Sequence, residues 1–226
     1  MAPPAAPARV RAVLFDLDGT LLDSAPDLAG AANRLRADHG LPPLPLAALR
    51  PMVGGGARGM VGVAFGVGPE DERFPALRDG FLAHYAQGLL DATRPFDGIE
   101  ALLQALEAAT LPWGIVTNKA ERFTRPIVDG LGLAARAAVV ICGDTTPHAK
   151  PHPEPLFEAA RRIGIAPADI AYVGDDHRDA LAARAAGMPM LAAAWGYLGQ
   201  GEPIDAWGAD AKMNSPAEVL NWLRQA

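Results

Sequence analysis

Two carboxylates, Asp16 and Asp18, stand one residue apart directly after the apolar run from Val13 to Phe15. The run predicts a short buried strand, and side chains at positions i and i+2 of an extended segment point the same way. Gly19 then permits a tight turn. Two carboxylates held together repel each other unless a cation or a shared proton relieves them. The spacing is therefore typical of a catalytic or ligand-binding site, because it does not stabilise the fold.

Three later places also put polar residues just after an apolar run. The residues at these places are Thr117, Asn118, Lys150, Asp175, Asp176 and Asp179. In open parallel α/β sheets, the carboxyl ends of the strands form the edge where ligands bind. Each place alone is a weak signal, because an acidic pair is usually a turn or a helix cap and a lone lysine is usually a solvated loop residue. Four such places in one chain favour a common site.

Short apolar runs alternate with amphipathic segments over most of the chain. This alternation predicts an α/β fold with a Rossmann-like parallel sheet and helices on both of its faces. The predicted strands are 13–15, 113–117, 139–142, 170–173 and 190–194. The predicted helices between them are 99–109, 121–131, 155–163 and 176–186.

Residues 25–91 interrupt the alternation and predict helices only, at 26–39, 46–52, 57–65 and 69–90. A stripe at helical spacing (Phe74, Leu77, Phe81, Tyr85 and Leu89) favours packing against another helix. We therefore expect an all-helical cap domain at 25–91, inserted into a core made of 10–24 and 92–226. Residues 1–9 are rich in alanine and proline and are expected to form a loose tail.

Composition narrows the class of protein. The chain has 226 residues, of which 50% are hydrophobic, and can bury a full core. Its net charge of -6 argues against nucleic acid as a partner but permits a small anionic substrate. Cys142 is the single cysteine, so no intramolecular disulfide can form. With no apolar run long enough to cross a bilayer, we expect a cytoplasmic protein that acts on a small molecule, without a membrane partner.

The ordered set of motifs resembles the haloacid dehalogenase-like superfamily, specifically its phosphatases with a helical cap after the first strand. The matching motifs are, in order, Phe15 to Leu21, Thr117-Asn118, Lys150-Pro151, and Gly174-Asp175-Asp176 with Asp179. The resemblance covers essentially the whole chain after the tail. The helical segment 25–91 falls where the cap of the family belongs.

The resemblance implies a role for each motif residue. Asp16 would attack phosphorus and form an aspartyl-phosphate, which divides the hydrolysis into two steps. Asp18 would protonate the leaving alkoxide and then deprotonate the attacking water. The residues expected around the phosphoryl group, with Lys150 pairing with its charge, are Gly19, Thr117, Asn118 and Lys150.

The resemblance also implies Mg²⁺, a hard cation that takes oxygen ligands. Its expected ligands are Asp16, the backbone carbonyl of Asp18, and Asp175. Asp176 would contribute directly or through water, and Asp179 would act through the ligands rather than on the ion.

Substrate choice is expected to come from the cap. Gly54-Gly55-Gly56 precedes a predicted helix and can offer backbone N–H groups to an anion, and Arg58 can bind a carboxylate with two hydrogen bonds. Within the superfamily, the chain most resembles the phosphoglycolate phosphatases and is also similar to bacterial N-acetylmuramic acid 6-phosphate phosphatases. Both substrates carry a carboxylate as well as a phosphate. We therefore expect a small carboxylated phosphomonoester, 2-phosphoglycolate first.

Three other functions, two of them catalytic, fit parts of the pattern. A β-phosphoglucomutase-like mutase shares the first motif and the cap position. A dehalogenase of this fold needs neither Asp18 nor Asp175, and both are present. A non-catalytic binding protein on this scaffold would be expected to lose the nucleophile or the metal carboxylates. A monomer and a homodimer are equally compatible with the sequence.

Overall fold

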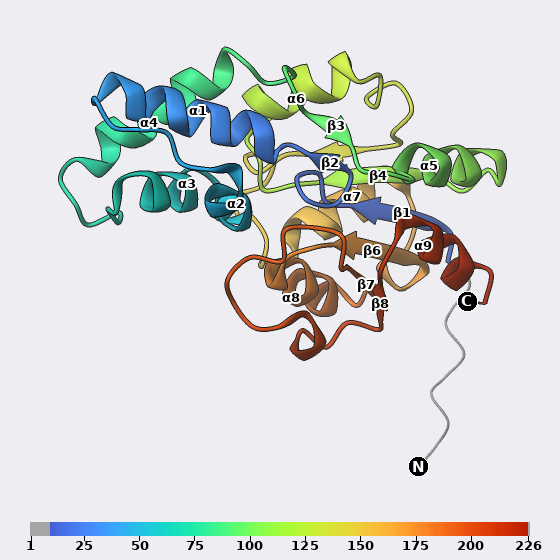
Figure 1. Cartoon of the computed structure of the whole chain (residues 1–226). Coiled ribbons are helices and arrows are strands. Elements are labelled where there is room, and N and C mark those ends of the chain that lie inside the picture. The colour runs from blue at the N-terminus through green and yellow to red at the C-terminus, as the bar shows by residue number, and fades with distance from the viewer. Residues whose placement is uncertain (1–9, 226) are drawn as a thin grey trace.

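A computed structural model describes residues 10–225, so the tail predicted at 1–9 lies outside the described residues. The strands of the main sheet are β1 (Ala12–Phe15), β4 (Trp113–Val116), β5 (Val140–Ile141), β6 (Ile170–Gly174), β7 (Met190–Ala193) and β8 (Ala211–Met213). Their order is β5-β4-β1-β6-β7-β8, and every neighbouring pair is parallel (Figure 1). The first strand of the chain therefore lies inside the sheet, between β4 and β6.

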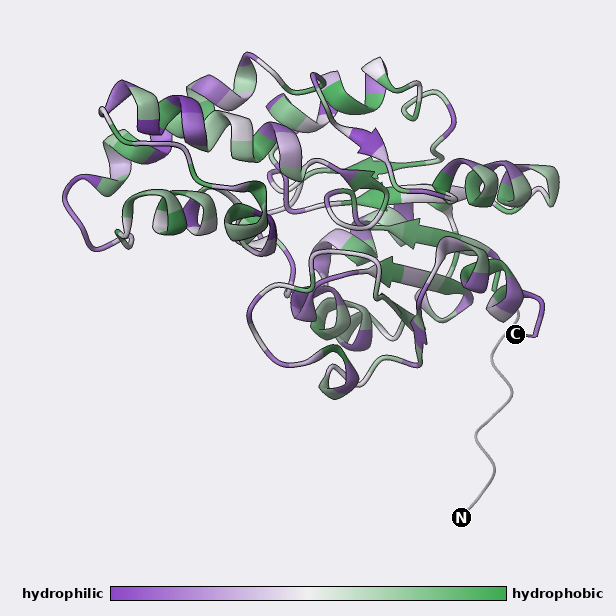
Figure 2. Cartoon of the chain, in the orientation of Figure 1, coloured by the Kyte–Doolittle hydropathy of each residue, from purple (hydrophilic) through white to green (hydrophobic). Residues whose placement is uncertain are grey.

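The sheet is buried on both faces. In β1, Val13 and Phe15 belong to one hydrophobic cluster, whereas Ala12 and Leu14 belong to the other. A strand covered on both sides reads as continuously apolar rather than alternating, and Figure 2 shows these strands in the colours of hydrophobic residues. This explains why an apolar run marked each of the predicted strands.

Helices cover both faces, as predicted. The first cluster includes side chains of α5 (Ile99–Ala108), α6 (Glu121–Gly130) and α9 (Pro216–Leu223). The second includes side chains of α7 (Glu154–Ile163) and α8 (His177–Ala186). Two short 3₁₀ turns, η2 (Pro167–Asp169) and η3 (Ile204–Ala206), lie in the connections. The predicted fold class is confirmed.

A helical segment is inserted after β1. Its elements are α1 (Ala25–Asp38), α2 (Leu46–Leu49), the 3₁₀ helix η1 (Arg50–Gly55), α3 (Gly56–Phe65) and α4 (Phe74–Ala86). The chain leaves the core through β2 (Leu22–Asp23) and returns through β3 (Arg94–Pro95), and these two strands pair antiparallel. In Figure 1 the helices gather on the side toward which β1 and β6 point. The limits 25 and 91 of a separate cap domain remain a prediction.

Buried Asp27 ties the two connections of this segment together. Its carboxylate accepts hydrogen bonds from the backbone N–H groups of Ala92 and Thr93, at 2.8 to 3.1 Å, and from the Thr93 hydroxyl at 2.7 Å. The start of α1 is thereby fixed to the chain that returns to the core.

Two of the predicted helices differ from the structure. The helix predicted at 69–90 is shorter, because α4 begins at Phe74 and has Pro75 in its first turn, where the missing N–H is harmless. Four residues of the stripe are buried, and Leu89 lies beyond the end of α4. The helix predicted at 46–52 divides into α2 and η1, with Pro51 in the first turn of η1.

Among residues 10–225, no helix combines the length and the apolar character that a membrane crossing requires.

Candidate active site

The carboxyl edge of the sheet brings the predicted polar residues together. Asp16 follows β1, Thr117 follows β4 and Asp175 follows β6. One pocket of about 340 Å³ lies between this edge and the helical segment. Its walls include all of these predicted site residues: Asp16, Asp18, Thr117, Asn118, Lys150, Asp175, Asp176 and Asp179.

Lys150 occupies the centre of the buried polar network. Its Nζ lies 2.9 Å from Oδ1 of Asp16 and 2.7 Å from Oδ1 of Asp179, and its side chain is only 2% exposed. Nζ also donates to the Tyr172 hydroxyl at 2.7 Å and to the Val116 carbonyl at 2.9 Å. Burial disfavours the ammonium charge, but the two carboxylates outweigh this effect and raise the pKa of Lys150. The lysine is therefore a fixed positive charge beside Asp16.

Asn118 holds the backbone of Lys150 in this structure. Its Oδ1 accepts from the Lys150 N–H at 2.9 Å, and its Nδ2 donates to the Lys150 carbonyl at 2.8 Å. Thr117 accepts a hydrogen bond from the Lys119 N–H at 3.1 Å, which leaves the Thr117 hydroxyl proton able to point elsewhere. Of the predicted phosphate ligands, Asn118 is thus already engaged in positioning the lysine.

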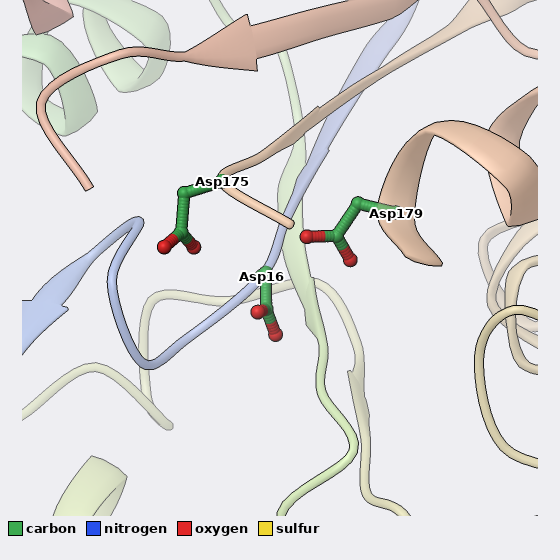
Figure 3. A group of neighbouring side chains, drawn as sticks. All are labelled: Asp16, Asp175 and Asp179. Carbon is green, nitrogen blue, oxygen red and sulfur yellow. The ribbon is translucent and has the colours of Figure 1, made fainter. Parts of the chain in front are cut away.

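Asp16, Asp175 and Asp179 form an acidic cluster, with one oxygen of each within 4.8 Å of the others (Figure 3). Asp175 accepts hydrogen bonds from the Thr20 hydroxyl and the Tyr197 N–H, both at 2.8 Å. Burial, followed by the charges of Asp16 and Asp179, raises the pKa of Asp175 well above its usual range. Burial also raises the pKa of Asp16 to about 6, although Lys150 opposes this. The single ammonium of Lys150 does not balance three carboxylates, so the cluster is electrostatically unfavourable without a further cation.

The carboxylate oxygens of the acidic cluster are suitable ligands for a hard divalent cation. Within residues 10–225, the buried Oδ1 of Asp16 has no hydrogen-bond partner of normal geometry, although it lies within ion-pair distance of Lys150. Gly19 has a φ of 91°, and a Cβ at this position would collide with the Asp175 carboxylate. The turn after β1 therefore approaches Asp175 as closely as a residue without a side chain allows. Carboxylate oxygens crowded in this way are the ligands that Mg²⁺ prefers.

Asp176 has a different environment from the other acids. It precedes α8 as the N-cap, and its carboxylate accepts from the Arg178 N–H at 2.9 Å and from the Arg178 guanidinium at 2.8 and 2.9 Å. The same guanidinium donates to the Gly54 carbonyl in η1. In this structure, Asp176 thus stabilises the start of α8 and holds Arg178 against the helical segment.

Asp18 lies beside Asp16 on the pocket wall and has two side-chain donors. The Ser24 hydroxyl donates to Oδ1, and Nζ of Lys119 lies 3.2 Å from Oδ1 and 3.0 Å from Oδ2. Lys119 has no role among those predicted from the sequence. The sequence feature that could have indicated a role for Lys119 is its position directly after Thr117-Asn118, at the end of a predicted strand.

Arg58 and Gly19 are not among the pocket-lining residues. Arg58 lies in the first turn of α3 with an exposed side chain. The glycines before it and Ala57 do line the pocket. The structure therefore places the predicted glycine turn at the pocket and Arg58 just outside its wall.

The sequence of the chain matches the model of a known protein family over residues 13–193, a family described as haloacid dehalogenase-like hydrolases. The chain belongs to this family. The match runs from β1 to β7 and so contains every predicted core motif, from Asp16 to Asp179.

This haloacid dehalogenase-like hydrolase is similar to proteins with two different names. It is 51% identical to a phosphoglycolate phosphatase of Xanthomonas campestris, covering 92% of this chain and 94% of that protein. It is 44% identical to an N-acetylmuramic acid 6-phosphate phosphatase of Pseudomonas aeruginosa, covering 96% of each. A crystal structure of a predicted phosphoglycolate phosphatase from Haemophilus somnus superimposes with a TM-score of 0.84 at 27% identity, covering 95% of this chain and 98% of that one. The family and these relatives confirm the prediction that the chain is an enzyme.

Proposed function

We propose that this hydrolase is a Mg²⁺-dependent phosphatase that cleaves a small carboxylated phosphomonoester through an aspartyl-phosphate on Asp16. The observation that carries the proposal is the position of Asp16. Its carboxylate lines the pocket, lies 2.9 Å from the buried ammonium of Lys150, and has Asp18 two residues away on the same pocket wall.

In the first step, a carboxylate oxygen of Asp16 attacks phosphorus while the bond from phosphorus to the leaving oxygen breaks. Asp18 gives its proton to that oxygen, so that the product leaves as an alcohol. The Lys150 ammonium and the Thr117 hydroxyl face the phosphoryl oxygens, whose charge must be neutralised in the transition state.

In the second step, a water molecule attacks the phosphorus of the aspartyl-phosphate. Asp18, now ionised, takes a proton from this water, and the bond from phosphorus to Asp16 breaks to release phosphate. The site then returns to its starting protonation state. Asp18 therefore serves in both steps, first as an acid and then as a base.

Asp16, Asp175 and the Asp18 carbonyl would hold Mg²⁺, with Asp176 contributing directly or through water. When bound, Mg²⁺ supplies positive charge that draws the phosphoryl group toward Asp16 and offsets the repulsion of the acidic cluster. Asp179, which pairs with Lys150, would act on the site through that lysine.

Two substrates fit the proposal, 2-phosphoglycolate and N-acetylmuramic acid 6-phosphate. The Xanthomonas relative supports the first of these. The size of the pocket favours the second, because about 340 Å³ is within the range that holds ligands much larger than a two-carbon acid. Part of the wall is apolar (Leu28, Val53, Phe81 and Phe123), which suits the body of a sugar derivative.

The test is Mg²⁺-dependent phosphate release, with kcat/KM for the two substrates measured side by side. A preference of orders of magnitude for 2-phosphoglycolate would select the first substrate, and the reverse would select the second. Sustained release also separates a phosphatase from a β-phosphoglucomutase-like mutase, which would retain its phosphoryl group after a burst. Absence of Mg²⁺-dependent release from either substrate would contradict the proposal.

A further inference from the structure

Lys119 is a buried lysine that the catalytic scheme above does not use. It follows Thr117 and Asn118 at the end of β4, and its side chain is 8% exposed. Its Nζ approaches both oxygens of Asp18, at 3.0 and 3.2 Å. The carboxylate partner of this buried lysine is therefore the proposed acid and base.

The opposite side of Lys119 contacts the helical segment. Nζ lies 4.6 Å from the ring centroid of Tyr85, which belongs to α4. The ring of Tyr85 is held between Phe81 and Phe123, with centroid distances of 6.3 and 5.5 Å. A cation facing an aromatic ring is attracted to it, and more strongly when both are out of water. Lys119 thus connects Asp18 in the core to α4 in the helical segment.

Stability alone is a weak explanation for this arrangement. A buried ion pair loses the hydration of both charges, and replacement by apolar residues is often neutral or stabilising. Within residues 10–225, the buried Tyr85 hydroxyl also has no hydrogen-bond partner. An unpaired hydroxyl, a buried ammonium and the Asp18 carboxylate all line the same pocket, which is where the leaving group must lie.

We propose that Lys119 is a positioning residue for Asp18 and that Tyr85 of α4 holds Lys119 in place, so that protonation of the leaving group depends on contact between the helical segment and the core. This inference rests on the proposed phosphatase activity. In its role, Lys119 fixes the direction of the Asp18 carboxylate together with the Ser24 hydroxyl, which also donates to Oδ1.

The effect of replacing Lys119 should depend on the leaving group. An alkoxide is a poor leaving group and needs a proton from Asp18, whereas 4-nitrophenolate leaves without one. A Lys119→Met variant should therefore lose kcat/KM on its alkyl substrate by about tenfold or more, but on 4-nitrophenyl phosphate by less than about threefold. The ratio kcat/KM is the relevant quantity because it reports only the steps through cleavage of the leaving group.

The experiment compares wild type, Lys119→Met, Tyr85→Phe and Tyr85→Leu on three substrates. These are the better of the two proposed alkyl substrates, 4-nitrophenyl phosphate and 4-carboxyphenyl phosphate. Tyr85→Phe keeps the ring beneath the ammonium and should therefore show a smaller selective loss than Tyr85→Leu. Tyr85→Leu removes the ring beneath the ammonium and should lose kcat/KM selectively on the alkyl substrate, by about threefold to tenfold. It tests the inference even if Lys119→Met does not fold, which thermal unfolding would reveal.

A selective loss on the alkyl substrate supports the inference. Equal losses on the alkyl and 4-nitrophenyl substrates would overturn it, because Lys119 would then act on the phosphoryl group or only on the fold. Losses on both the alkyl substrate and 4-carboxyphenyl phosphate, with 4-nitrophenyl phosphate spared, would also overturn it and assign Lys119 to the substrate carboxylate. A wild-type protein inactive on all three would instead refute the proposed function, which separates the two failures.

Discussion

The Nζ atom of Lys150 lies 2.7 Å from Oδ1 of Asp179, and the two side chains are only 2% and 1% exposed. The same Nζ lies 2.9 Å from Oδ1 of Asp16. One buried cation thus stands between the proposed nucleophile and a carboxylate that caps the turn into α8, since Asp179 also accepts from the Asp176 N–H at 3.0 Å. Breaking this pair therefore affects both the fold and the chemistry.

We predict that Lys150→Met lowers the free energy of unfolding by about 3–5 kcal/mol, because it leaves buried carboxylates without a counter-charge. Urea unfolding at neutral pH measures the effect. Lys212→Met is the matched control, because Lys212 pairs with Asp205 on the surface and such a pair is worth at most about 1 kcal/mol. Similar losses for the two variants would contradict the structural account of Lys150.

Stability of the Mg²⁺-free protein should depend on pH through Asp16. Burial raises the pKa of Asp16 from 3.8 to about 6, so the folded state binds the proton more tightly than the unfolded state. The resulting stabilisation is complete below about pH 4 and is lost as the pH rises through about 6. The free energy of unfolding of the wild type should fall over this interval, and by less in Asp16→Asn, because the amide does not titrate.

Urea unfolding in EDTA at closely spaced pH values measures these slopes. Some slope should remain in Asp16→Asn, since the pKa of Asp175 is raised as well. Asp79→Asn, which changes an exposed aspartate paired with Arg78, should match the wild type. Parallel curves for the wild type and Asp16→Asn would show that Asp16 is not strained by burial.

Mg²⁺ should raise the unfolding temperature, because a ligand that binds only the folded state stabilises it, by about 2.7 kcal/mol at a hundredfold excess over Kd. Asp175→Asn should abolish this shift, and Asp79→Asn should preserve it. Asp176→Asn should weaken the shift less than Asp175→Asn, because Arg178 already engages the Asp176 carboxylate. A full Mg²⁺ shift in Asp175→Asn would remove Asp175 from the metal site.

Arg58→Ala tests whether Arg58 of the helical segment binds the substrate carboxylate. A hydrogen-bonded charge pair contributes about 1.5–3 kcal/mol, so kcat/KM on a carboxylated substrate should fall by tenfold or more. Hydrolysis of 4-nitrophenyl phosphate, which has no carboxylate, should be unaffected. Because Arg58 lies just outside the pocket wall, an equal result on both substrates would assign carboxylate recognition to another cation.

The strands and the core motifs could be predicted because they depend on local patterns. Asp16, Thr117 and Asp175 each follow a continuous apolar run, and parallel strands bring their carboxyl ends to one edge. The family model over residues 13–193 agrees with that interpretation. Strand β8 was missed because Ala211–Met213 has a charged residue at its centre and no apolar run.

The contacts between distant residues could not be predicted from one sequence. Lys119 and Tyr85 are far apart along the chain, and only the packing of α4 beside α6 brings them together. Tyr197 is a second example, since its N–H binds Asp175 while its hydroxyl accepts from the N–H groups of Ser24 and Ala25 at the start of α1. Neither tyrosine lies in a motif that identifies its role.

The proposed mechanism requires a covalent phosphoryl group on Asp16. The decisive measurement is acid quenching of the enzyme during turnover with Mg²⁺ and substrate, followed by mass spectrometry of the peptide that contains Asp16. We predict a peptide heavier by one phosphoryl group in the wild type and its absence in Asp16→Asn, which should also release no phosphate. An Asp16→Asn variant that turns over at a near-normal rate would contradict the mechanism.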